Sequence, residues 1–196
     1  EEALVLPGEV YVGGDSHTNT TGALGCFATG MGHTDVAYVL LNGKIWFKVP
    51  ETILFNLEGE LPSYVMAKDV ILKIIADHGT DVGNYKAIQF AGSAISKMPM
   101  EERLTLTNMT TEAGAKNGII EPDQKTIDYV KERTDAPFTA VVGDKDAKYV
   151  DIHTYEVDKL EPTVAKPFSP ANISTARELS NVPIDKAYIG SCTGAK

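Results

Sequence analysis

The chain has 196 residues, 43% hydrophobic and 23% charged, with a formal net charge of −9. This is long enough to bury the core of one or two α/β units, and no apolar run approaches the roughly 20 residues that a membrane-spanning helix needs. The acidic balance disfavours binding to the phosphate backbone of nucleic acid. We expect no nucleic-acid and no membrane partner. Two widely spaced cysteines favour a reducing, cytoplasmic location over a disulfide scaffold.

Hydrophobic patterns of helical and strand period alternate along most of the chain. Strands are expected at residues 9–13, 44–49, 52–58, 85–91, 149–155 and 186–189. Helices are expected at residues 22–30, 35–42, 67–77, 100–113 and 122–133, several of them bounded by glycine or proline. This order predicts an α/β fold in which mixed sheets are flanked by helices.

A proline-rich stretch marks the expected domain boundary. Residues 162–170 contain three prolines and few large apolar side chains, which is typical of an irregular connector. We therefore expect residues 1–160 to form one α/β region. Residues 161–196 are expected to form a connector and the start of the next α/β domain, in which the strand at 186–189 leads to Cys192.

The segment Gly13-Gly14-Asp15-Ser16-His17-Thr18 follows the first predicted strand. Its carboxylate, hydroxyl and imidazole, in consecutive residues, form a candidate acid/base site. Neighbouring side chains of an extended chain point to opposite faces, so we expect no Ser-His-Asp triad within the segment, and each residue should find its partner elsewhere. The alternative is a polar turn in which Asp15 and Ser16 cap the following helix and His17 is merely exposed.

Two further segments carry polar groups of the kind that such a site needs. Residues 107–115 include Asn108 and Glu112, an amide and a carboxylate that an imidazole site could recruit. The segment Gly190-Ser191-Cys192-Thr193-Gly194 holds a cysteine among small residues. An anionic substrate would need cations from outside these segments, because they contain none of the three arginines, Arg103, Arg133 and Arg177.

Four long motifs resemble one family. GGDSHTNTTGALGCFATGMGHTDVA, KIWFKVPETI, TNMTTEAGAKNGI and YIGSCTG are similar, in sequence and order, to signatures of the large subunit in the aconitase superfamily, in particular its isopropylmalate dehydratase and homoaconitase branch. The resemblance covers essentially the whole chain. It implies that this is a fragment of a multidomain large subunit with aconitase-type α/β domains. The implied enzyme is a hydro-lyase that isomerises a 2-hydroxy di- or tricarboxylic acid by dehydration and rehydration at a [4Fe-4S] cluster.

The resemblance also implies roles for individual residues. His17 matches a histidine that contacts the iron-bound hydroxyl or water, and Glu112 matches the carboxylate that orients this imidazole. Asp15 matches a carboxylate paired with a histidine upstream of residue 1. Ser16 matches a hydroxyl that binds a substrate carboxylate, and Asn108 an amide near the cluster.

Cys192 matches the first of three cluster ligands, and the other two belong to a C-x-x-C segment that the family carries further along, beyond Lys196. Cys26 matches no ligand and lies in an apolar stretch, so we expect it in the core. One thiolate cannot hold a cluster, so this fragment is expected to carry none and to be inactive alone. The resemblance further implies a small subunit that supplies arginine and the catalytic serine, and a small polycarboxylate substrate.

The residues after His17 lack the proline that aconitases proper carry there, which favours the dehydratase branch, isopropylmalate as substrate and leucine biosynthesis as pathway. Homocitrate and 2,3-dimethylmalate stay open as substrates. A binding module that keeps the fold without chemistry is the alternative from another class, but it would have no chemical need for the site residues. A hydrolase with Ser16 or Cys192 as nucleophile ranks below both, because the sequence shows no suitably oriented base.

Overall fold

The computed structural model describes residues 2–193. The strands are β1 (Val10–Gly13), β2 (Phe27–Gly30), β3 (Glu51–Glu58), β4 (Lys86–Ala91), β5 (Asn117–Ile120), β6 (Asp151–Glu156), β7 (Thr163–Ala165) and β8 (Ile173–Thr175). The α-helices are α1 (His33–Asn42), α2 (Ala67–His78), α3 (Ser93–Lys97), α4 (Met100–Asn108) and α5 (Gln124–Lys131), and the 3₁₀ helices are η1 (Thr18–Leu24) and η2 (Val157–Lys159). None of the helices in this part of the chain combines the length and apolar character of a membrane span.

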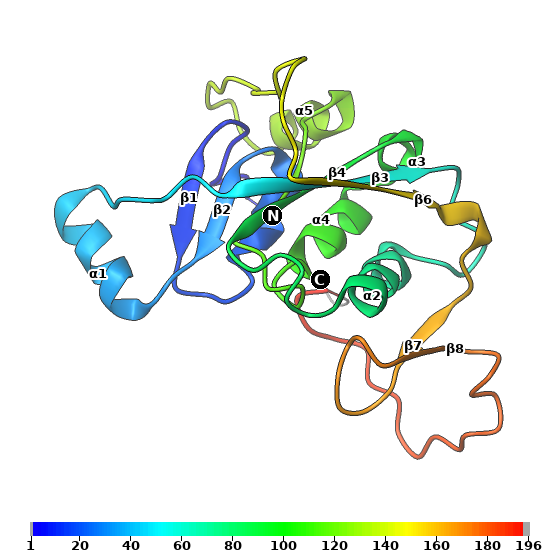
Figure 1. Ribbon diagram of the computed structural model, residues 1–196. Coiled ribbons are helices and arrows are strands. Elements are labelled where there is room, and N and C mark those ends of the chain that lie inside the picture. Colours follow the sequence, from blue (N-terminus) through cyan, green and yellow to red (C-terminus); the bar gives the residue numbers. More distant parts are fainter. Residues whose placement is uncertain (1, 194–196) are drawn as a thin grey trace.

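A parallel sheet in the order β5-β4-β3-β6 forms the centre of the molecule (Figure 1). β1 and β2 form a separate parallel pair, and β7 and β8 an antiparallel pair. Parallel neighbours need crossover connections, which the helices between the strands provide. The predicted α/β fold is confirmed, but each of these sheets is purely parallel or purely antiparallel rather than mixed.

The main core lies between the central sheet and α2 with α4. Ile53, Phe55 and Leu57 alternate along β3 and are buried, because successive side chains of a strand point to opposite faces. They belong to one apolar cluster with Val70 and Ile74 of α2, whose spacing places both on one helix face. This packing explains why the prediction for α2 succeeded to within a residue.

An ion pair joins α4 to the start of α5. Arg103 is fully buried, and its two terminal nitrogens donate to the two carboxylate oxygens of Asp123 at 2.8 and 2.6 Å. Asp123 also caps α5 by accepting the backbone N–H of Thr126 at 3.1 Å. Arg103 therefore has a structural role.

The helix predicted at residues 22–30 is wrong. Residues 18–24 form η1, and the following residues form β2. The hydroxyls of Thr18, Thr20 and Thr21 each donate to the carbonyl three residues earlier, which matches 3₁₀ rather than α-helical spacing. Gly25 then takes a left-handed conformation (φ 76°), which ends the helix.

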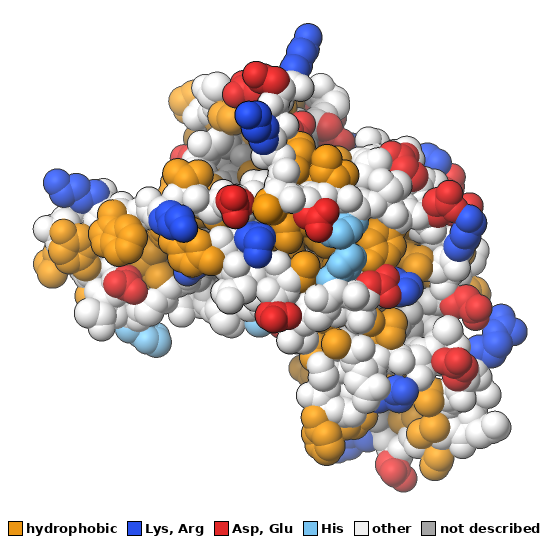
Figure 2. Space-filling model, in the orientation of Figure 1, with side chains coloured by type: hydrophobic (Ala, Val, Ile, Leu, Met, Phe, Trp, Pro, Cys, Tyr) orange, Lys and Arg blue, Asp and Glu red, His pale blue; other side chains and the backbone are white. Residues whose placement is uncertain are grey.

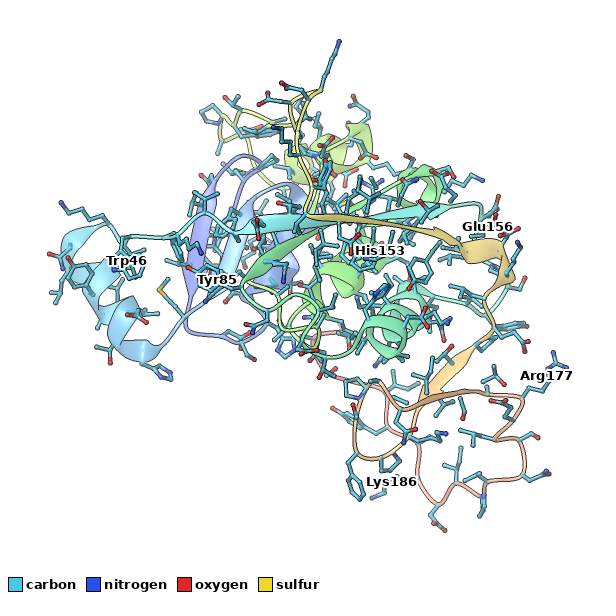
Figure 3. All side chains as sticks on the ribbon, viewed as in Figure 1. Trp46, Tyr85, His153, Glu156, Arg177 and Lys186 are labelled. Carbon is cyan, nitrogen blue, oxygen red and sulfur yellow. The ribbon has the colours of Figure 1, made fainter. Side chains whose placement is uncertain are left out.

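Three other predictions need correction. Residues 44–49 form no strand, and Trp46 is 83% exposed after the projecting helix α1 (Figure 3). Residues 186–189 form no strand either, because no described segment pairs with them. The helix predicted at 100–113 ends at Asn108, and turns continue to Gly114, where φ is 76°.

Asp69 links the β7–β8 sheet to the start of helix α2. Its carboxylate accepts the backbone N–H of Met66 at 2.8 Å, at the start of α2, and that of Thr163 at 2.6 Å, at the start of β7. The hairpin of β7 and β8 thus packs against α2. The domain boundary after residue 160 stays a prediction.

Candidate active site

The Asp15-Ser16-His17 segment lies directly after the carboxyl end of β1. It forms a turn between β1 and η1 rather than a continuation of the strand. Gly30, at the end of β2, lies against this turn: a Cβ there would be 2.6 Å from the carbonyl oxygen of Asp15. Glycine at position 30 therefore permits the close approach that shapes the turn.

Glu112 reaches His17 from the turns that follow α4. Nε2 of His17 lies 2.7 Å from Oε1 of Glu112, and the two side chains are 27% and 31% exposed. The hydroxyl of Thr111 donates to the carbonyl oxygen of Ser16 at 3.1 Å, which ties the two segments together. The early end of α4 makes this contact possible, because the turns bring residues 111 and 112 beneath the segment after β1.

Ser16 bonds to its own neighbour, contrary to the expectation that each residue finds its partner elsewhere. Its hydroxyl oxygen lies 2.8 Å from Nδ1 of His17. Residues 15–17 form a turn rather than extended chain, so adjacent side chains can meet. An ionised Glu112 only accepts, so Nε2 of His17 donates to it, and Nδ1 of the neutral ring accepts the Ser16 hydroxyl.

Asp15 accepts the backbone N–H of His17 at 2.8 Å, and its own carbonyl accepts the Thr18 hydroxyl at 2.7 Å. The capping alternative does not hold for Asp15, because its carboxylate closes a turn onto His17 and no side-chain hydrogen bond caps the start of η1. The capping alternative does not describe His17, which is half-buried and paired with Glu112. The pairing of Asp15 with a histidine upstream of residue 1 stays a prediction.

Asn108 belongs to the same network through Thr20. Its Nδ2 donates to the Thr20 hydroxyl at 2.7 Å, and that hydroxyl donates to the carbonyl oxygen of His17 at 2.6 Å. Two buried acceptors, Oδ1 of Asn108 and Oε2 of Glu112, have no hydrogen-bond partner among residues 2–193. Buried polar atoms are normally paired, so these two oxygens indicate a place that receives a donor.

A cavity of about 520 Å³ opens beside Asp15 and Ser16. Tyr85 and Lys116 also line it, and Nζ of Lys116 lies 5.3 Å from the centre of the Tyr85 ring. Lys116 is a cation beside the candidate site that the sequence argument missed, because only arginines were considered. Its position in the chain, four residues after Glu112, could have revealed it.

The two cysteines differ in solvent exposure. Cys26 is buried as predicted, its thiol donates to the carbonyl oxygen of Thr21 at 2.9 Å, and burial raises its pKa to about 11. Cys192 is exposed, and Oγ1 of Thr105, one helical turn before Asn108, lies 3.4 Å from the carbonyl oxygen of Thr193.

A cluster needs several thiolates. The described residues contain no group of three or more His, Cys, Asp or Glu side chains that could hold a metal. They do not fit an iron–sulfur cluster by themselves.

Hydroxyl, imidazole and carboxylate groups in series, beside buried acceptors, form a candidate acid/base site on an α/β scaffold. The chain belongs to the aconitase family (aconitate hydratase), which it matches over residues 1–179. The catalytic roles of Asp15, Ser16, His17, Asn108 and Glu112 stay predictions.

Curated relatives match the whole chain. It is 53% identical over 196 residues to the chloroplastic 3-isopropylmalate dehydratase large subunit of Arabidopsis thaliana, covering 38% of that protein. It is 50% identical over 196 residues to the 3-isopropylmalate dehydratase large subunit of Heliobacterium modesticaldum and 51% identical over 199 residues to large subunit 1 of Pyrococcus abyssi, covering 47% of each. The chain thus spans less than half the length of these relatives.

Proposed function

We propose that this chain is part of the large subunit of an iron–sulfur hydro-lyase that isomerises a 2-hydroxy acid by dehydration and rehydration. The substrate we favour is 3-isopropylmalate, an intermediate of leucine biosynthesis. Identities of 50–53% to relatives named for that dehydratase, over the whole chain, support this choice. Homocitrate and 2,3-dimethylmalate are the alternative substrates. The two free cysteines agree with a reducing compartment such as the cytoplasm.

The observation that carries the proposal is the pair of unpartnered buried acceptors beside His17. Oδ1 of Asn108 and Oε2 of Glu112 each face a desolvation cost of about 1–3 kcal/mol if they stay unpaired. A bound hydroxyl or water offers the O–H donor that would remove this cost. A dehydratase substrate and its leaving water both carry such donors.

His17 is the proton-handling group in this proposal. In the neutral tautomer Nε2–H donates to Glu112, so Nδ1 is the nitrogen at which a proton is gained or lost. When Nδ1 takes a proton, the Glu112 carboxylate 2.7 Å from Nε2 stabilises the imidazolium. Glu112 also fixes the ring orientation, as outer carboxylates do for functional histidines.

Ser16 and Lys116 are the candidate groups for a substrate carboxylate, because both line the cavity beside Asp15. The Ser16 hydroxyl would exchange its hydrogen bond to His17 for one to the ligand. We propose that a small subunit supplies the arginine and the catalytic serine. A cluster would take Cys192 as one ligand and the rest from outside this chain.

The test is turnover by the large subunit completed to the length of its relatives, assembled with its small subunit and reconstituted anaerobically with iron and sulfide. Each candidate acid is supplied in turn, and the unsaturated intermediate is followed by ultraviolet absorbance. We expect turnover of 3-isopropylmalate that His17→Ala abolishes. No turnover of any of the three acids by the assembled wild-type protein would contradict the proposal and favour the binding module.

One observation favours a second candidate, acyl transfer. Ser16, His17 and Glu112 form a hydroxyl–imidazole–carboxylate series with contacts of 2.8 and 2.7 Å, which supplies the base that the sequence argument lacked. A fluorophosphonate probe separates the two candidates. Labelling of Ser16 that depends on His17 would favour acyl transfer, and no labelling is expected for the hydro-lyase.

A further inference from the structure

Two histidines remote in sequence meet at the open edge of the central sheet. His78 is the last residue of α2, and His153 lies in the edge strand β6, opposite Phe55 of β3. Their ring centroids are 4.2 Å apart and the ring planes are inclined by 49°. Figure 3 shows His153 at this edge, and Figure 2 shows pale-blue histidine side chains on the surface beside carboxylates.

Hydrogen bonds fix the tautomer of His78. Tyr155 donates its hydroxyl proton to Oδ2 of Asp77 at 2.8 Å, so its oxygen can only accept from Nε2 of His78, 3.0 Å away. Burial, together with the bond to Asp77, raises the pKa of Tyr155 and keeps this proton in place. His78 therefore carries its proton on Nε2 and has a lone pair on Nδ1.

His153 faces a carboxylate on the other side, at ion-pair distance. Its Nε2 lies 3.0 Å from Oδ2 of Asp151, and the adjacent carboxylate favours a proton on that nitrogen. Nδ1 again carries the lone pair. Neither Nδ1 atom has a hydrogen-bond partner in the described part of the chain. Outer carboxylate and hydroxyl partners on Nε2 are the usual second layer of histidine metal sites.

The surroundings of the pair favour a cation. Asp77 and Asp151 flank it, and Lys73 is paired with Asp77 at 2.6 Å. The carboxyl end of α2 adds partial negative charge at His78. Burial, and then the neighbouring His153, lower the pKa of His78, so the ring is neutral at pH 7. Both rings are only partly buried, so an ion can reach them from solvent.

We propose that Nδ1 of His78 and Nδ1 of His153 bind one divalent transition-metal ion of borderline softness, such as Ni²⁺, Zn²⁺ or Cu²⁺. No third His, Cys, Asp or Glu ligand is placed for it within residues 2–193, so water fills the other positions. Two protein ligands make this site weaker than a closed four-ligand zinc site. The ion clamps β6, and the segment that follows it, to the end of α2.

The experiment measures Ni²⁺ binding by the 196-residue chain with Cys192→Ser, which removes the exposed thiol. Calorimetry gives the stoichiometry, and Tm with and without Ni²⁺ gives the stabilisation. Binding of one ion should raise Tm by roughly 3–6 °C at a tenfold excess over Kd. His78→Gln and His153→Gln should each remove this rise, and His33→Gln, on the exposed helix α1, should keep it.

Electron paramagnetic resonance with Cu²⁺ gives a second readout on the chain with its histidines intact. Nitrogen hyperfine splitting from two imidazoles is expected. This spectrum shows whether two histidines bind the ion even if one Gln variant fails to fold. Retention of the Tm rise in either folded Gln variant would overturn the proposal. So would the absence of saturable binding, or a Cu²⁺ spectrum without two nitrogens.

Discussion

The side-chain amide of Asn108 donates to the hydroxyl of Thr20 at 2.7 Å, from one segment of the site to the other. Because the Thr20 proton is already donated to the carbonyl oxygen of His17 at 2.6 Å, the amide nitrogen must face Thr20. The amide oxygen of Asn108 therefore points away from Thr20 and is left as a buried acceptor without a partner among the described residues. Thr20 thus determines which atom Asn108 presents to the site.

Two substitutions of Thr20 separate the effect of its hydroxyl on turnover from the effect of its methyl group. Thr20→Val keeps the shape but leaves Asn108 Nδ2 without its acceptor, so the amide can turn and present nitrogen to the ligand. In the assembled enzyme we expect kcat to fall roughly tenfold or more, with Thr20→Ser close to wild type. Equal turnover in Val and Ser variants would show that the hydroxyl does not orient Asn108.

Substitution of the two cysteines should affect cluster content differently in the complete enzyme. Cys192→Ser removes an exposed candidate thiolate and should abolish cluster absorbance and turnover. Cys26→Ser replaces a buried thiol that already donates to the Thr21 carbonyl, so cluster content should stay nearly unchanged, at a modest cost in stability. Iron and sulfide content per subunit is the measurement. Similar losses in both variants would refute the assignment of Cys192.

Lys116 should act on substrate binding. Lys116→Met removes the ammonium group beside Ser16 but keeps the length of the side chain. If Lys116 attracts a substrate carboxylate, KM should rise about tenfold with kcat little changed, because a uniform binding contribution is lost. Lys131→Met, on the exposed side of α5, is the control. An unchanged KM in Lys116→Met would remove this lysine from the binding site.

The buried ion pair supports a prediction of stability. Asp123→Asn leaves Arg103 buried without a countercharge and should lower the free energy of unfolding by about 3 kcal/mol in urea denaturation. Glu60→Gln breaks the exposed pair with Lys97 and should cost less than about 0.5 kcal/mol. Comparable losses would mean that burial does not strengthen the Arg103 pair.

The same pair predicts a pH dependence. Partial burial opposes ionisation of Asp123, but hydrogen bonds from Arg103 and Thr126 outweigh it and lower the pKa of this carboxyl below its usual range. The stabilisation is therefore fully present above about pH 4 and is lost as pH falls through the folded pKa. The difference in unfolding free energy between wild type and Asp123→Asn should shrink between pH 5 and pH 3. A constant difference would contradict the ionised pair.

The sequence predicted those parts of the fold in which one residue pattern decides the structure. The apolar spacing of α2 and the alternation in β3 each specify a buried face, and both elements were found within a residue. The failures lie where local hydrogen bonds or neighbours decide. Threonine hydroxyls selected 3₁₀ geometry at residues 18–24, and residues 186–189 have no described strand to pair with.

The sequence indicated which residues the candidate site brings together, but it did not indicate all the contacts between them. The family resemblance indicated Glu112 as the partner of His17, across 95 residues of sequence. The contact of Ser16 with His17 was missed because it depends on a turn where strand geometry was assumed. Thr20 was missed because its role depends on tertiary position, and Lys116 was missed because only arginines were considered as cations.

If His17 and Glu112 act as one proton-handling unit, a double-mutant cycle on kcat of the assembled enzyme will show that their effects are coupled. His17→Ala removes the base, and Glu112→Gln keeps the shape of the side chain while removing the charge 2.7 Å from Nε2. Each change alone should lower kcat roughly a hundredfold or more, and the double mutant should be little worse than His17→Ala. Fully multiplicative losses would show that the two residues work independently and would contradict the account.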